Sequence, residues 1–106
     1  YGGGDSSQVY IEDEDPQLPL SVSLSQNYPN PFNSSTQIEF SIPYEGEVNL
    51  SVYNLMGRRV AVLLNEVKRA GQHSANWDAG GLASGIYFYR LTYEGEFLCR
   101  RMLLIK

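Results

Sequence analysis

The sequence predicts an all-β sandwich, and three observations support this. Apolar residues alternate with polar ones through most of the chain after residue 19, which is the period-two pattern of half-buried strands. Turn-forming residues interrupt the alternation at short, regular intervals. Only residues 65–70 leave room for a helix, and that window is too short for a helix to stand without packing. About seven short antiparallel strands around one core therefore account for the 106-residue chain.

The expected elements follow one another at regular spacing. Strands are predicted at residues 37–42, 47–52, 60–64, 73–77, 85–93 and 97–106, with turns at 43–46, 54–57, 70–71, 78–81 and 94–95. In the third of these strands, Val60, Val62 and Leu64 are expected to share the buried face. Gly57 is expected to occupy a left-handed turn position, and Trp77 to be the largest core residue.

Residues 1–18 are expected to form a disordered acidic linker ahead of one domain at residues 19–106. This segment holds five acidic residues and no basic one, and it includes Gly2–Gly4 and the block Glu12–Asp15. Such a composition buries too little apolar surface to offset the entropy of ordering. The net charge of −4 is therefore located in the linker, since seven acids and eight bases remain in the domain.

Charge and hydropathy exclude two classes of partner. The predicted domain is nearly neutral, so it lacks the excess of lysine and arginine that neutralises a nucleic-acid backbone. The longest continuous apolar run is Val60–Leu64, far below the roughly 20 residues of a membrane-spanning helix. We expect no nucleic-acid partner and no membrane insertion. The chain begins at Tyr1 and not at Met, which indicates a piece of a longer precursor.

No arrangement of residues favours catalysis. The one histidine, His73, precedes Ser74 in a strand, where neighbouring side chains point to opposite faces, so we expect a partly buried histidine and no nucleophile–base pair. Cys99 lies in an apolar strand and is expected to be a small core or half-core residue. The chain has no loop of alternating acids for Ca²⁺, and its His and Cys are too few for zinc. We expect neither enzymatic activity nor a cofactor or metal.

Carbohydrate binding is the alternative that the sequence leaves open. Eight tyrosines and one tryptophan supply flat rings that can stack on sugars. Tyr44 and Tyr93 flank predicted turns and are the candidate glycan contacts. On this interpretation the domain is a non-catalytic accessory module of a secreted enzyme, which binds carbohydrate or attaches to the cell surface.

The C-terminal strand breaks the alternation. Leu103 and Ile105 fall on one face of a strand, and Met102 and Leu104 fall on the other, so both faces are apolar. Basic residues bracket this apolar run. Either the strand is covered on both sides, or it is an exposed edge suited to recognition by strand addition.

Five motifs in this order closely resemble the type A C-terminal sorting domain of the type IX secretion system. They are Leu24–Asn33 followed by Thr36, Val52–Asn54 with Gly57 and Arg58, Trp77–Asp78, Gly85–Leu91 and Met102–Lys106. The related immunoglobulin-like domain of the flagellar hook-capping protein shares the Gly-x-Tyr-x-Tyr type of strand. The resemblance covers about residues 20–106 and implies an immunoglobulin-like sandwich. Because Pro29 and Pro31 restrict the backbone, Tyr28 and Phe32 are expected to pack over the open end of this sandwich.

The resemblance also implies a function, that of a non-catalytic sorting signal, or address, at the end of a secreted bacterial precursor. The outer-membrane secretion machinery recognises such a domain, and a sortase-like enzyme removes it while it attaches the N-terminally fused cargo to the cell surface, after passage through the periplasm. Carried over by position, the address residues are Gly85, Tyr87, Tyr89, Leu91, Arg101, Met102, Leu103, Leu104, Ile105 and Lys106. Cleavage is expected within residues 1–22.

Overall fold

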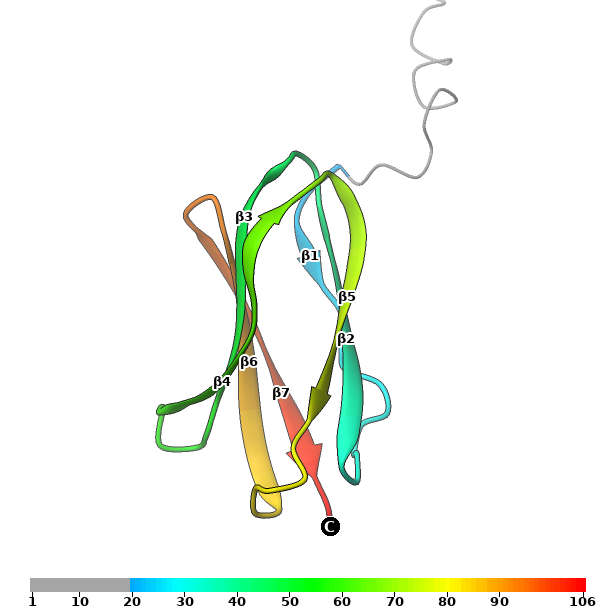
Figure 1. The fold of residues 1–106 in the computed structure, drawn as a ribbon, viewed down its shortest axis with the longest axis vertical. Helices are drawn as coiled ribbons and strands as arrows, with labels where there is room; N and C mark the ends of the chain where they lie inside the picture. The colour runs from blue at the N-terminus through cyan, green and yellow to red at the C-terminus, as the bar shows by residue number, and fades with distance from the viewer. Residues whose placement is uncertain (1–19) are drawn as a thin grey trace, which may run out of the picture.

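The computed structural model describes residues 20–106, which form an immunoglobulin-like sandwich of two antiparallel sheets (Figure 1). The strands are β1 (Ser23–Leu24), β2 (Ser35–Ile42), β3 (Gly46–Tyr53), β4 (Arg59–Lys68), β5 (Gly71–Asp78), β6 (Gly85–Tyr93) and β7 (Glu96–Leu104). One sheet has the order β1-β2-β5 and the other β4-β3-β6-β7. The predicted fold class is confirmed, and the window at 65–70 that left room for a helix is strand as far as Lys68. The predicted linker at 1–18 lies outside the described residues.

The core lies between the two sheets and is built by the residues that the alternation places inward. It comprises Leu24, Phe32, Ile38, Phe40, Ile42, Val48, Leu50, Val52, Trp77, Ala79, Tyr87, Tyr89, Leu91, Tyr93, Met102 and Leu104. The ring of Trp77 lies 5.9 Å, centroid to centroid, from both Phe32 and Tyr87. The Trp77 side chain therefore packs against β6 and against the segment between β1 and β2. It lies in the core, as expected from its size.

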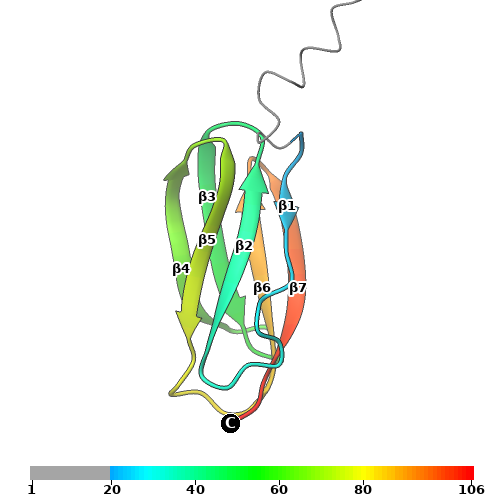
Figure 2. The same ribbon diagram turned by 90° about the vertical axis from the view of Figure 1, so that its right-hand side faces the viewer.

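The last two strands form a tight hairpin. Tyr93 pairs with Glu96, so only Glu94 and Gly95 form the loop, and their φ angles are 49° and 81°. Two consecutive positive φ angles are typical of the two-residue turn whose twist matches that of the strands it joins. This turn places β7 beside β6 at the edge of the four-stranded sheet. Figure 2 shows β7 next to β1, where the edges of the two sheets meet.

Two sequence-based expectations about side-chain direction are wrong. Val62 is 47% exposed because Leu63 forms a β-bulge: Leu50 pairs with Leu64, but the next residue, Ser51, pairs with Val62. The extra residue turns Val62 to the outer face of the sheet. Tyr28 is 79% exposed and does not pack over the end of the sandwich, whereas Phe32 is buried as expected.

Candidate functional site

The terminal strand β7 has one buried and one exposed apolar face. Met102 and Leu104 point into the core and are 1% and 0% exposed, whereas Leu103 and Ile105 are 36% and 51% exposed. The sequence left open whether the strand is covered on both sides or forms an exposed edge. The strand is not covered on both sides, because β7 is the last strand of its sheet, its inner face seals the sandwich and its outer face meets solvent.

The backbone edge of β7 is already occupied near its end. We refer to residues 26–32 as the edge clasp. The Phe32 amide donates to the Leu103 carbonyl at 3.0 Å, and the Ile105 amide donates to the Phe32 carbonyl at 2.9 Å, which forms a short parallel bridge. The Leu103 amide donates to Asn30 Oδ1 at 3.0 Å. Strand addition by a partner at Leu103–Ile105 is therefore blocked in this conformation.

Further hydrogen bonds extend this cover toward the middle of β7. Gln26 Nε2 donates to the Arg101 carbonyl at 2.7 Å, and Arg100 Nε donates to the Leu24 carbonyl at 2.6 Å. An edge strand with apolar residues is a template for aggregation, and covering it is one of the ways in which proteins prevent that. The hypothesis of an open edge thus needs correction: what β7 presents is the side-chain surface of its outer face.

The clasp is held in place by residues that the sequence interpretation missed. Asn27 is only 2% exposed, and its Nδ2 donates to the Pro29 carbonyl at 3.1 Å and to Thr36 Oγ1 at 3.0 Å. The Thr36 hydroxyl donates in turn to the Pro29 carbonyl at 2.9 Å. The available signal was the alternation of Asn and Pro at 27–31, since these residue types favour side-chain to backbone bonds in irregular segments.

Lys106, the last predicted address residue, is bound to the loop between β5 and β6. Its Nζ donates to the Leu82 carbonyl at 2.9 Å and also to the Gly80 carbonyl. Its backbone amide donates to Ser84 Oγ at 2.9 Å. Arg101, by contrast, extends from the outer face of β7 and is exposed. The two predicted cationic residues therefore differ, because Lys106 stabilises a loop and Arg101 faces solvent.

The predicted address residues of β6 lie inside the sandwich. Tyr89 and Leu91 are 0% exposed and Tyr87 is 7% exposed, while Gly85 is half-buried and pairs with Leu104. The Tyr89 hydroxyl donates to the Ser25 carbonyl at 2.6 Å, and burial raises the pKa of Tyr89 to about 12. These side chains support β7 from within and are not available to a partner in the folded domain.

The candidate glycan contacts do not form a pair of stacking rings. Tyr44 is 75% exposed, but Tyr93 is only 5% exposed, and its hydroxyl donates to the Tyr44 carbonyl at 2.8 Å. A sugar ring cannot stack on a buried face, so Tyr93 is corrected to a core residue that fixes the turn after β2. A hollow between β3, β4 and the β6–β7 turn is lined by neither tyrosine and mainly by polar and acidic residues such as Glu47 and Glu94.

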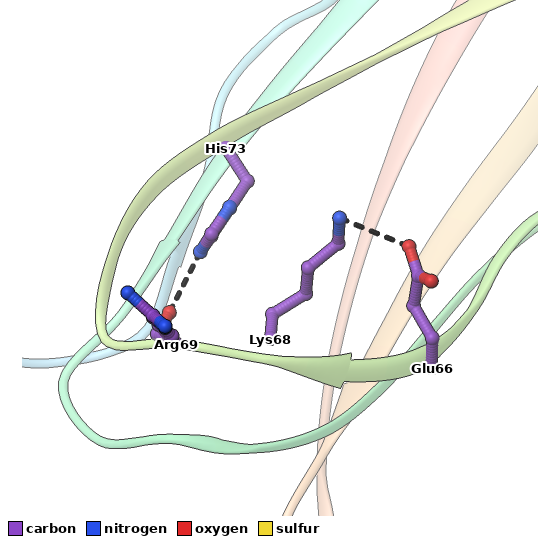
Figure 3. A network of polar contacts seen from close by, with 4 residues as sticks. All are labelled: Glu66, Lys68, Arg69 and His73. Carbon is purple, nitrogen blue, oxygen red and sulfur yellow. Dashed lines mark hydrogen bonds and ion pairs between the residues drawn. The ribbon is translucent and has the colours of Figure 1, made fainter.

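The residues weighed for catalysis lie in ordinary structural roles. His73 is half-buried, as predicted, and its Nε2 donates to the Arg69 carbonyl at 2.7 Å (Figure 3). The ion pair between Lys68 Nζ and Glu66, at 2.9 Å, lies on β4 beside this turn. Cys99 is exposed, not a core or half-core residue, because β7 turns it to the outer face.

Residues 20–106 contain no cluster of three or more His, Cys, Asp or Glu side chains placed to hold a metal ion. None of the described segments is a helix with the length and apolar character needed to cross a membrane.

Comparison with known families agrees with the sequence motifs. The family described as "Secretion system C-terminal sorting domain" matches residues 26–106, which includes every strand from β2 onward and the edge clasp. Among curated proteins, none matches this chain. The family match covers most of the chain and the whole terminal strand. The chain therefore belongs to the family of C-terminal sorting domains of the type IX secretion system.

Proposed function

We propose that this domain directs an N-terminally fused cargo protein through the periplasm and across the outer membrane to the cell surface or the medium. Membership of the sorting-domain family supports the general role, a C-terminal signal that interacts with the type IX machinery. The family's role is sorting and not catalysis, so any enzymatic activity belongs to the cargo.

The proposal rests on one observation, the exposed outer face at the end of β7. Arg101, Leu103 and Ile105 share this face, and Ile86 pairs with Leu103 on the neighbouring strand. A small apolar surface with an adjacent positive charge suits a partner with an apolar, acidic face. We therefore assign recognition to Arg101, Leu103 and Ile105, and assign the buried Met102 and Leu104 to stability.

Residues 1–18 serve in this proposal as the linker between cargo and domain, and a sortase-like enzyme cleaves within residues 1–22. The support is the acidic, glycine-containing composition of the segment, together with the exposure of Leu20, which is 98% exposed where the described chain begins. A polar, glycine-containing segment at the edge of a domain is the kind of substrate that a processing enzyme can bind.

A reporter fusion tests the proposed function. The whole chain is joined to the C-terminus of a reporter that carries its own signal for export to the periplasm, in a bacterium with a working type IX system. We expect the reporter on the cell surface or in the medium, and in the periplasm when the system is disabled or the chain is omitted. Retention in the periplasm of the intact fusion contradicts the proposal.

A further inference from the structure

Charge is unevenly divided between the two ends of the sandwich. Acids predominate at the end that carries the β2–β3 and β6–β7 turns, where Glu45, Glu47, Glu94 and Glu96 are exposed and Lys68 and Arg69 are the basic residues. The opposite end carries the β3–β4 turn and the end of β7 (Figure 1), and there Arg58, Arg59 and Arg101 are exposed, with Asp78 as the exposed acid. The register confirms this placement, because Tyr53, which precedes the turn, pairs with Phe88, and Phe88 pairs with Arg101.

The β3–β4 turn presents two large apolar side chains beside this charge. Leu55 is 67% exposed and Met56 is 89% exposed. The turn is held in shape, since Asn54 Oδ1 accepts hydrogen bonds from the Met56 amide at 3.0 Å and the Arg58 amide at 2.9 Å. Gly57 adopts a φ of 85°, which completes the turn. The exposed side chains therefore extend from a turn with a defined, hydrogen-bonded conformation.

We define the basic tip as Leu55, Met56, Arg58 and Arg59. Its two apolar side chains are not part of the core, and two arginines follow them after Gly57. This arrangement suits a lipid layer, which is anionic at its surface and apolar a few ångströms below it. Arginine can bind phosphate oxygens while the leading Leu and Met enter the apolar region beneath.

We propose that the basic tip is a peripheral binding surface for a lipid layer with phosphate-bearing, anionic head groups. A lipid layer fits better than a protein because the apolar residues are at the apex of a turn, and a protruding tip enters a fluid layer without a matching socket. The inference concerns lipid contact alone and does not rest on the proposed secretion role.

The acids at the other end of the sandwich do not oppose this contact. Nine residues of β6 separate the two ends, which corresponds to about 30 Å at roughly 3.3 Å per residue. The Debye length at physiological ionic strength is only about 8 Å, so a surface at the basic tip scarcely interacts with the acids at the other end. The local excess of arginine determines the attraction.

Vesicle flotation with the whole chain tests the proposal. The probes are vesicles of phosphatidylcholine containing phosphatidylglycerol, compared with vesicles of phosphatidylcholine alone. We expect the chain to float with the anionic vesicles and not with the zwitterionic ones. Arg58→Gln with Arg59→Gln should weaken partitioning about 30-fold, from about fivefold for each basic residue near an anionic surface. Leu55→Ser with Met56→Ser should weaken it about tenfold.

The matched control removes two charges at the other end of the sandwich, by Lys68→Gln with Arg69→Gln. This variant should float as the original chain does, and circular dichroism should show that all variants are folded. The proposal is overturned if the anionic vesicles do not bind the chain, as would be the case if the tip meets an acidic protein. It is also overturned if the control loses as much binding as the tip variants.

Discussion

The two faces of the terminal strand should respond to substitution in opposite ways. Met102 and Leu104 are almost completely buried, and truncating such a residue to Ala costs about 2–5 kcal/mol through lost burial and the cavity left behind. Domains of this size are stable by about 5–15 kcal/mol, so Leu104→Ala removes a large fraction of the free energy of unfolding. Export should then fall with the fraction of the domain that stays folded.

Substitutions on the outer face should separate recognition from stability. Leu103 and Ile105 are 36% and 51% exposed, so Leu103→Thr and Ile105→Thr remove apolar surface but keep a side chain that suits a strand. Cross-strand pairs such as Leu103 with Ile86 contribute about 0.2–1 kcal/mol, which sets the expected loss of stability for each variant. The double variant should remain folded yet fail to direct export.

Urea unfolding followed by tryptophan fluorescence supplies the stability measurement, because Trp77 is the only tryptophan and lies in the core. Export is measured with the reporter fusion. Val67→Thr is the control, since Val67 is 57% exposed on β4, far from β7 in the strand order. The reasoning is refuted if the double variant exports the reporter normally, or if it unfolds as easily as Leu104→Ala.

Three further predictions follow from single contacts. Tyr89 has a pKa near 10 in an unfolded chain and about 12 in the fold, so its contribution to stability is complete below pH 10 and is lost as the pH rises toward 12; Tyr89→Phe should remove about 2–3 kcal/mol of that pH dependence in urea unfolding, and equal slopes for both proteins would contradict this. Asn27→Ala should remove two buried hydrogen bonds, to Pro29 and Thr36, at a cost of about 1–3 kcal/mol, and should speed hydrogen exchange at the Ile105 amide; unchanged exchange there would show that Asn27 does not hold the clasp. Gly57→Ala should lower the free energy of unfolding by about 1–2 kcal/mol because of its positive φ, whereas Gly81→Ala, which meets no neighbouring atom and lacks that constraint, should not, and equal losses would be contrary to this reason.

Local pattern was sufficient to predict most strands. The alternation of Ile38, Phe40 and Ile42 is a property of the chain itself, and the structure buries all of these residues. The same holds for the hairpin at Glu94 and Gly95, whose residue types favour a tight turn. Where apolar and polar residues alternate without interruption, the sequence is enough to predict a strand and its buried face.

The failures share a different cause, which is pairing between distant segments. The bulge at Leu63 depends on how β4 aligns with β3, and it reverses the direction of Val62. Cys99 is exposed because, within residues 20–106, no second sheet covers the outer face of β7, which the alternation alone cannot reveal. The clasp joins Phe32 to Leu103 across 71 positions, and no local pattern in either segment indicates that contact.

The most direct test of the central claim is site-specific cross-linking in cells. A photoreactive phenylalanine derivative replaces Leu103 in the reporter fusion, and a second fusion carries it in place of the exposed Val67. The account predicts an adduct with an outer-membrane component of the type IX system from position 103 and not from position 67. No adduct at 103, or equal adducts from both positions, would contradict the assignment of recognition to the outer face of the terminal strand.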